Sequence, residues 1–185
     1  MKATDILMDE HRVIERVLSV LELATDRLEA GEQVEPGLFI DAADFIRNFA
    51  DGCHHRKEEG VLFVAMNEAG MPADSGPIAV MLAEHVQARA YTRALLEGAE
   101  KMQAGDAAAT DQVVQNARSY AALLRQHIAK EDQILFPMAD NVLAAPARQE
   151  KLLAEFERVE AEEAGADVHD RYVALADELE RQIGA

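Results

Sequence analysis

The chain has 185 residues, and its 35 acidic against 18 basic side chains give it a formal net charge of −17. Nucleic acids and anionic membrane surfaces are poor partners for so acidic a chain, because contacts with phosphate groups need basic side chains. A single cysteine, Cys53, excludes an intrachain disulfide, and no run approaches the roughly 18 apolar residues of a membrane span. We therefore expect a cytoplasmic protein without nucleic-acid or membrane partners.

Glycine and proline residues divide the chain into four long segments followed by two short ones. The long segments span about 5–30, 37–69, 77–104 and 107–143, and the short ones span about 147–164 and 168–183. Hydrophobic residues make up 49% of the chain but aromatic residues only 5%, a composition that favours helices over sheets. Each segment is therefore predicted to be a helix.

Apolar residues at alternating spacings of three and four give three of the long segments the stripe of a bundle helix. The stripes include Leu7, Ile14, Leu18 and Leu21, then Ile78, Leu95 and Met102, then Val113, Tyr120, Leu124 and Ile134. In the second segment the stripe that starts at Phe45 and Phe49 drifts around the helix axis. We predict an all-α, up-down-up-down four-helix bundle over residues 1–145. A C-terminal helical extension, residues 146–185, is expected to fold back onto the bundle or, alternatively, to form a homodimer surface.

Polar side chains interrupt the stripes at positions where leucine would be expected. They are His11, His85, His127 and Glu131, which His54 and Glu58 join in the second segment. Burying a carboxylate costs several kcal/mol unless it is paired or binds a metal. A pair of divalent metal ions would turn these imidazoles and carboxylates into ligands. His54 and Glu58 are four residues apart, as are His127 and Glu131, so each pair projects from one face of a helix.

The chain also repeats itself. Glu10-His11 recurs 74 residues later as Glu84-His85. The run from His54 to Phe63, with Lys57, Glu58 and Leu62, recurs as the run from His127 to Phe136, with Lys130, Glu131 and Leu135. The first two helices are thus repeated as the third and fourth, and such a duplication places equivalent ligands around a pseudo-two-fold axis. This arrangement is suited to a site for two metal ions.

These motifs, which extend over residues 1–145, resemble those of the hemerythrin-like family, whose members carry an HHE cation-binding domain. The resemblance implies a four-helix bundle that holds two iron ions in a non-haem centre bridged by two carboxylates. Matched position by position, it implies His11, His54, His85 and His127 as terminal ligands and Glu58 and Glu131 as bridges.

Two positions depart from the pattern of the oxygen-carrying members of that family. Those proteins have a second histidine one turn after the third-helix histidine, where this chain has Arg89. A site with four histidines is more open, which argues against simple reversible oxygen carriage. Oxygen carriers also tend to place an aspartate five residues after the last-helix histidine. Asp132 holds that place here, but the internal repeat favours Glu131 as the ligand.

Other metal sites fit the sequence less well. Ferritin-like di-iron proteins use Glu-x-x-His motifs, and zincins use His-Glu-x-x-His, and the chain contains neither. A closed structural zinc site needs more thiolates than the single cysteine supplies.

Residues near the predicted ligands are expected to play lesser parts. We expect His55 to hydrogen-bond a ligand or face solvent, and Cys53 and Tyr120 to pack in the core. Glu10, Glu84 and His169 are expected to lie on the surface, whereas Glu15 and Asp132 are expected either to be surface charges or to hydrogen-bond a ligand.

The resemblance implies that the iron centre binds oxygen, nitric oxide or peroxide, in sensing, iron handling or stress response. The alternative is a di-iron enzyme with catalase- or peroxidase-like turnover, or with redox turnover of nitric oxide. No general acid, base or nucleophile stands out beyond the metal ligands, so we name no catalytic residue. A metal-free adaptor bundle is the third interpretation. An iron–zinc or iron–manganese pair would suit the same ligands.

Overall fold

The structure is a computed structural model that describes residues 1–164 and 168–184. Its helices are α1 (Ala3–Glu29), α2 (Pro36–Phe45), η1 (Ile46–His55), η2 (Glu58–Leu62), α3 (Phe63–Glu68), α4 (Gly76–Gln103), η3 (Ala107–Ala109), α5 (Thr110–Lys130), η4 (Glu131–Leu135), α6 (Phe136–Val142), α7 (Pro146–Ala164) and α8 (Val168–Ile183). Neither described range contains a strand, so the predicted all-α class is confirmed. No helix within them is long and apolar enough to cross a membrane.

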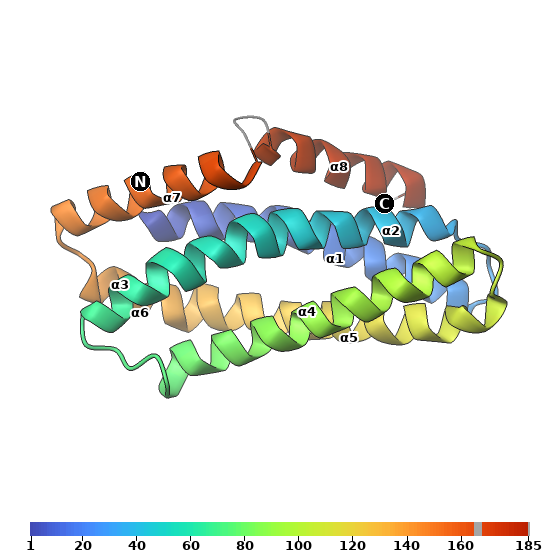
Figure 1. The fold of residues 1–185 in the computed structure, drawn as a ribbon, viewed down its shortest axis with the longest axis horizontal. Coiled ribbons are helices and arrows are strands. Elements are labelled where there is room, and N and C mark those ends of the chain that lie inside the picture. Colours follow the sequence, from blue (N-terminus) through green and yellow to red (C-terminus); the bar gives the residue numbers. More distant parts are fainter. Residues whose placement is uncertain (165–167, 185) are drawn as a thin grey trace.

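Four helical arms form an up-down-up-down bundle, as the sequence predicts (Figure 1). The first arm is α1, the second runs from α2 to α3, the third is α4, and the fourth runs from η3 to α6. Contacts join α4 to α5, α1 to α5 and α2 to α4. The apolar stripes of the arms therefore face one another across a shared interior.

Two apolar clusters fill this interior at successive levels along the bundle. The Leu7 cluster includes Leu7, Leu62, Met81 and Leu135, and the Leu18 cluster includes Ile14, Leu18, Phe49, Ala88 and Leu124. Along α1, His11 lies between Leu7 of one cluster and Ile14 of the other. His85 holds the corresponding place along α4, between Met81 and Ala88. A polar layer therefore separates the two clusters.

Three segments, η1, η2 and η4, are π-helical, with backbone hydrogen bonds from i to i+5 in place of i to i+4. Such a wide turn takes up an extra residue and rotates the following side chains about the axis. This rotation explains the drifting stripe of the second segment. In η4 it turns Leu135 into the core at 1% exposure and leaves Ile134 54% exposed, so the predicted place of Ile134 in the stripe was wrong. η2 and η4 begin at Glu58 and Glu131, equivalent positions of the repeat.

The C-terminal helices α7 and α8 lie end to end along one side of the bundle (Figure 1). α7 contacts α1, η1 and η2, while α8 contacts α1 and α2. Phe156 of α7 joins the Leu7 cluster, and Tyr172 of α8 joins the Leu18 cluster. Arg16 of α1 donates to Glu180 at 2.9 Å. These helices cover the first two arms, whereas the division of the chain at residue 145 and a dimer surface stay predictions.

Candidate metal centre

All six predicted ligands lie in the polar layer. At most 1% of the surface of each is exposed, and all four arms contribute. The first arm supplies His11, the second His54 and Glu58, the third His85, and the fourth His127 and Glu131. Duplicated helices thus bring equivalent side chains to one level of the bundle.

Glu58 stands between two histidines from different arms. Its Oε1 lies 3.4 Å from Nε2 of His54, and its Oε2 lies 3.4 Å from Nε2 of His85. Two adjacent ligands that each lie about 2.1 Å from one metal ion are themselves about 3 Å apart. Each oxygen of Glu58 therefore lies at about the distance from its histidine that two ligands of one cation would have.

Glu131 faces the other pair of histidines. Its Oε2 lies 3.2 Å from Nε2 of His11 and 3.3 Å from Nε2 of His127. All four carboxylate oxygens of Glu58 and Glu131 are buried without a hydrogen-bond partner among the described residues, as are Nε2 of His11 and His54. Buried acceptors left unpaired cost several kcal/mol. A cation would satisfy them, so the residues fit a metal site.

The other ring nitrogen of each predicted histidine ligand faces a carboxylate. The Nδ1 distances are 2.7 Å for His11 to Asp132, 2.9 Å for His54 to Glu10, 2.7 Å for His85 to Glu59 and 2.9 Å for His127 to Glu84. Because an ionised carboxylate only accepts, Nδ1 carries the proton and Nε2 presents a lone pair to the centre. The expectation that Glu10 and Glu84 are surface charges was therefore wrong, whereas Asp132 orients a predicted ligand, which was one of the two roles expected for it.

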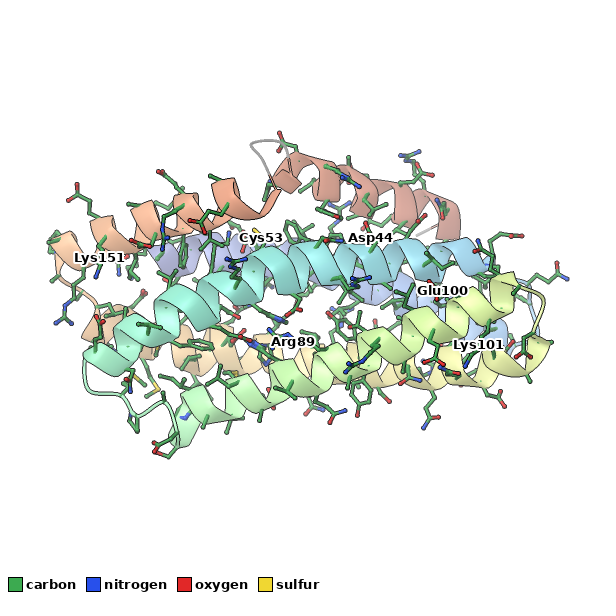
Figure 2. The ribbon with its side chains drawn as sticks, viewed as in Figure 1. Asp44, Cys53, Arg89, Glu100, Lys101 and Lys151 are labelled. Carbon is green, nitrogen blue, oxygen red and sulfur yellow. The ribbon has the colours of Figure 1, made fainter. Side chains whose placement is uncertain are left out.

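Basic side chains hold these outer carboxylates in turn. Lys57 binds Glu10, Lys130 binds Glu84, Arg12 binds Asp132, and Arg89 binds Glu59 at 2.7 Å. Arg89 stands where the oxygen carriers have a histidine, and the sequence left its role open. The Nε of Arg89, which is labelled in Figure 2, donates to Asp51 at 2.6 Å. Arg89 therefore links α4 to η1 and is not one of the histidines and carboxylates that could hold a metal.

His55 does not face solvent, which was one of the two roles expected for it. It is only 2% exposed, its ring stacks on that of His85 with centroids 3.8 Å apart, and its Nε2 is buried without a partner among the described residues. The internal repeat does not indicate a role for His55 in the site, because the equivalent position holds Ile128. The signal available was the pair of adjacent histidines, which a π-helical turn brings to the same side of the helix more closely than an α-helical turn does.

Ligand atoms gather in two groups that share Glu58. One group is His11, His54, Glu58 and Glu131, and the other is His55, Glu58, His85 and His127, with the ligand atoms of each group within 4.8 Å of one another. Nε2 of His85 lies 3.0 Å from Nε2 of His127. In both rings Nδ1 carries a proton and donates it in a hydrogen bond to a carboxylate. The two Nε2 lone pairs therefore face each other at a distance that suits a shared cation.

The protein environment shifts the pKa values within the centre in opposite directions. Burial and then the charge of Glu58 raise the pKa of Glu131 well above its ordinary value. Burial lowers the pKa of His127 to about 4. Although burial opposes its charged form, His54 has its pKa raised to about 9 by Glu58 and Glu10. Without a cation, the imidazoles and carboxylates of the polar layer must therefore share protons. A bound metal ion would displace these protons.

The remaining candidates of the sequence analysis lie outside the two groups. Cys53 is buried on the side of the second arm that faces α7, near Glu10 and Glu160 (Figure 2). Tyr120 is fully buried in the Leu18 cluster. His169 is exposed, and Glu15 pairs with Arg12 at 2.8 Å.

Comparison with known proteins identifies related sequences. One protein of Mycobacterium bovis and two of Mycobacterium tuberculosis, all described as uncharacterized, are 29% identical to this chain over 143 residues, or 77% of its length. The match covers 55% of those relatives, so the chain spans about half of their length. No solved structure matches the chain.

A family model agrees with the geometry of the polar layer. The model described as "Hemerythrin HHE cation binding domain" matches residues 2–139, which include both halves of the repeat and every histidine and carboxylate of the two groups. From this match and the buried histidine–carboxylate layer, we conclude that the chain belongs to the hemerythrin HHE cation-binding family.

Proposed function

We propose that the two groups each hold an iron ion and that Glu58 and Glu131 bridge the pair. The observation that carries this proposal is the position of Glu58, whose two oxygens face histidines of different groups. Glu131 supports it with one oxygen that lies near both His11 and His127. The proposed ligand set is the predicted one with His55 added.

The donor set favours iron over metals that prefer sulfur or oxygen alone. Imidazole nitrogens and carboxylate oxygens suit iron, manganese and zinc, whereas thiolates would select softer ions. Cys53 takes no part in either group. Five imidazoles and two carboxylates divided over two six-coordinate ions would leave ligand positions open. When bound, iron at such positions supplies one-electron chemistry toward oxygen, nitric oxide or peroxide.

The chain's own residues would orient and shield the centre. The outer carboxylates hold each imidazole in one tautomer and one ring orientation, and the basic side chains behind them hold the carboxylates. The Leu7 and Leu18 clusters keep water from both sides of the layer. No further acid or base lies within the groups, which favours binding or simple redox chemistry of a small ligand over an elaborate substrate reaction.

The proposed function is therefore the binding of oxygen, nitric oxide or peroxide at a di-iron centre, in sensing, iron handling or stress response. A fifth imidazole makes the proposed centre less open than a four-histidine set would be, which supports reversible binding. The alternative is an enzyme that turns over peroxide or nitric oxide. It is supported by the coordination positions that the seven ligands would leave open on the two ions.

The test begins with anaerobic loading of the purified protein with ferrous iron, followed by elemental analysis. We expect two irons in the wild type and loss of the pair in Glu58→Ala, with His169→Ala as a control that replaces a histidine outside the groups. Full iron loading in Glu58→Ala would contradict the bridging role. Peroxide is then added to the loaded protein. Sustained oxygen evolution supports the enzyme, and a stoichiometric spectral change without turnover supports the binding protein.

A further inference from the structure

A cavity of about 470 Å³ lies beside the polar layer, between η1, α4 and α5. This volume is within the range of pockets that hold small organic molecules. His55 and Tyr120 line it, together with the charged residues Arg47, Asp51, Arg89 and Arg93. None of these residues except His55 belongs to the two metal-binding groups.

The cavity exists because the internal repeat is broken at this place. Ala88 and Thr92 of α4 line it. The positions 74 residues earlier, on α1, hold Ile14 and Leu18, which are fully packed in the core. The smaller side chains of the third arm leave space that the first arm fills. Close packing is the rule in protein interiors, so the smaller side chains of α4 leave room for a ligand that side chains as large as those of α1 would exclude.

The charge of the lining indicates the sign of that occupant. Three guanidinium groups line the cavity against the single carboxylate of Asp51, although the chain as a whole has a net charge of −17. Arg89 is engaged with Asp51 and Glu59. Arg47 and Arg93 are exposed, and within residues 1–164 and 168–184 neither has an ion-pair or hydrogen-bond partner. Two guanidinium groups are thus available to bind a carboxylate.

One buried polar atom at the cavity is left over by the metal centre. The hydroxyl of Tyr120 is buried with no hydrogen bond to any described residue, whereas Nε2 of His55, which also has none, is assigned to the proposed metal centre. Tyr120 and Asp51 line the same cavity, and burial, followed by the charge of Asp51, raises the pKa of the Tyr120 hydroxyl. A buried hydroxyl without a partner is destabilising, and a ligand oxygen at the inner end of the cavity would accept its hydrogen bond.

We propose that this cavity binds a small organic carboxylate that carries a second oxygen, as in an oxo acid. The charged end meets Arg47 and Arg93 at the surface, and the far oxygen accepts from the Tyr120 hydroxyl inside. Ile46, Ala88 and Leu96 cover the apolar chain between the two ends. A molecule bound in the cavity would contact His55, which is a proposed iron ligand. The binding of the carboxylate does not depend on the proposed function, but its position next to an iron centre does.

Calorimetric titration of both metal-free and iron-loaded protein tests the proposal. The probes are 4-oxopentanoate and its longer homologue 6-oxoheptanoate, with pentanoate as the control that lacks the far oxygen and methyl 4-oxopentanoate as the control that lacks the charge. We expect the oxo acids to bind about tenfold more tightly than pentanoate, the value of one hydrogen bond, and the ester not to bind measurably.

Three variants separate the contributions of the lining. Tyr120→Phe should remove the preference for the oxo acid while retaining pentanoate, and Arg47→Gln with Arg93→Gln should weaken all the carboxylates about tenfold or more. Thr92→Leu, which gives α4 the side chain that α1 carries, should block the cavity with iron content unchanged. Because the two arginines are exposed, their variant is informative even if Thr92→Leu fails to fold.

The outcomes distinguish this inference from the proposed function. Binding of the oxo acids to a protein that takes up no iron would support the cavity and contradict the di-iron centre. Iron loading without binding of any probe at millimolar concentration would overturn the cavity proposal alone. Equal affinity for the acid and its ester would also overturn it, because the arginines would then play no part.

Discussion

Lys57 and Lys130 occupy equivalent positions of the repeat but differ in burial, so a matched pair of substitutions measures what burial contributes. Lys57 is fully buried and binds Glu10 of the first arm and, at 2.7 Å, Glu160 of α7. Lys130 binds Glu84 in the same way, but its side chain is 36% exposed, since the contacts of α7 and α8 lie mainly with the first two arms. Lys57→Met should therefore be far more destabilising than Lys130→Met.

The magnitude follows from the charge that is left behind. Removing one partner of a buried ion pair costs about 3–5 kcal/mol. Glu10 is 2% exposed but would keep its bond from Nδ1 of His54 at 2.9 Å, so we expect the lower figure, about 3 kcal/mol. An exposed pair contributes about 0–1 kcal/mol. At about 2.1 cal/mol/K of unfolding entropy per residue, a chain of this length loses about 8 °C in Tm for 3 kcal/mol.

Thermal and urea unfolding of the metal-free variants, followed by circular dichroism, measures both costs under one set of conditions. We expect a Tm about 8 °C lower for Lys57→Met and about 3 °C lower at most for Lys130→Met. Equal losses in the two variants, or a greater loss in Lys130→Met, would refute the reasoning that burial under α7 sets the strength of the pair.

Three further predictions concern the polar layer and its surroundings. His55→Ile, which copies the residue at the equivalent position of the fourth arm, should lose one of the two irons while the fold remains; unchanged iron content would show that His55 is not a ligand. Glu131→Gln should raise the unfolding free energy of the metal-free protein at neutral pH by about 1–3 kcal/mol, because it removes a carboxyl group that must take up a proton when it is buried beside Glu58, and it should impair iron loading; a less stable metal-free variant would contradict this. Cys53 is 5% exposed, and burial raises its pKa to about 11. At about pH 8 a thiol reagent should therefore modify it at least about a hundredfold more slowly in the folded than in the unfolded protein, with a rate that rises as the pH increases; equally fast modification in both states would count against a buried, protonated thiol.

The bundle and most of the site follow from patterns that the sequence carries openly. Helix stripes with a period near 3.6 predict the arms, and histidines such as His11 and His85 stand out because they occupy positions of leucine. The repeat identifies Glu58 and Glu131, since equivalent ligands recur at equivalent places. These inferences depend only on periodicity and residue type, which a single sequence displays.

The features that could not be predicted from the sequence depend on local helix geometry and on how the arms pack against one another. A π-helical turn is a departure from regular periodicity, so the burial of His55 and the exposure of Ile134 could not be read from an α-helical pattern. Glu10 and Glu84 lie about 100° from the inward histidines of their own helices. They matter because they reach His54 and His127 of the neighbouring arms. The cavity likewise needs the space between three helices.

The most direct test of the central claim is iron X-ray absorption of the protein after anaerobic loading. The account predicts nitrogen and oxygen neighbours only, a signature of histidine ligation, and an iron–iron feature within about 4 Å, as expected for a carboxylate-bridged pair. Absence of that feature at full iron occupancy, or a sulfur neighbour, would contradict a bridged centre built from the histidines and glutamates of the polar layer.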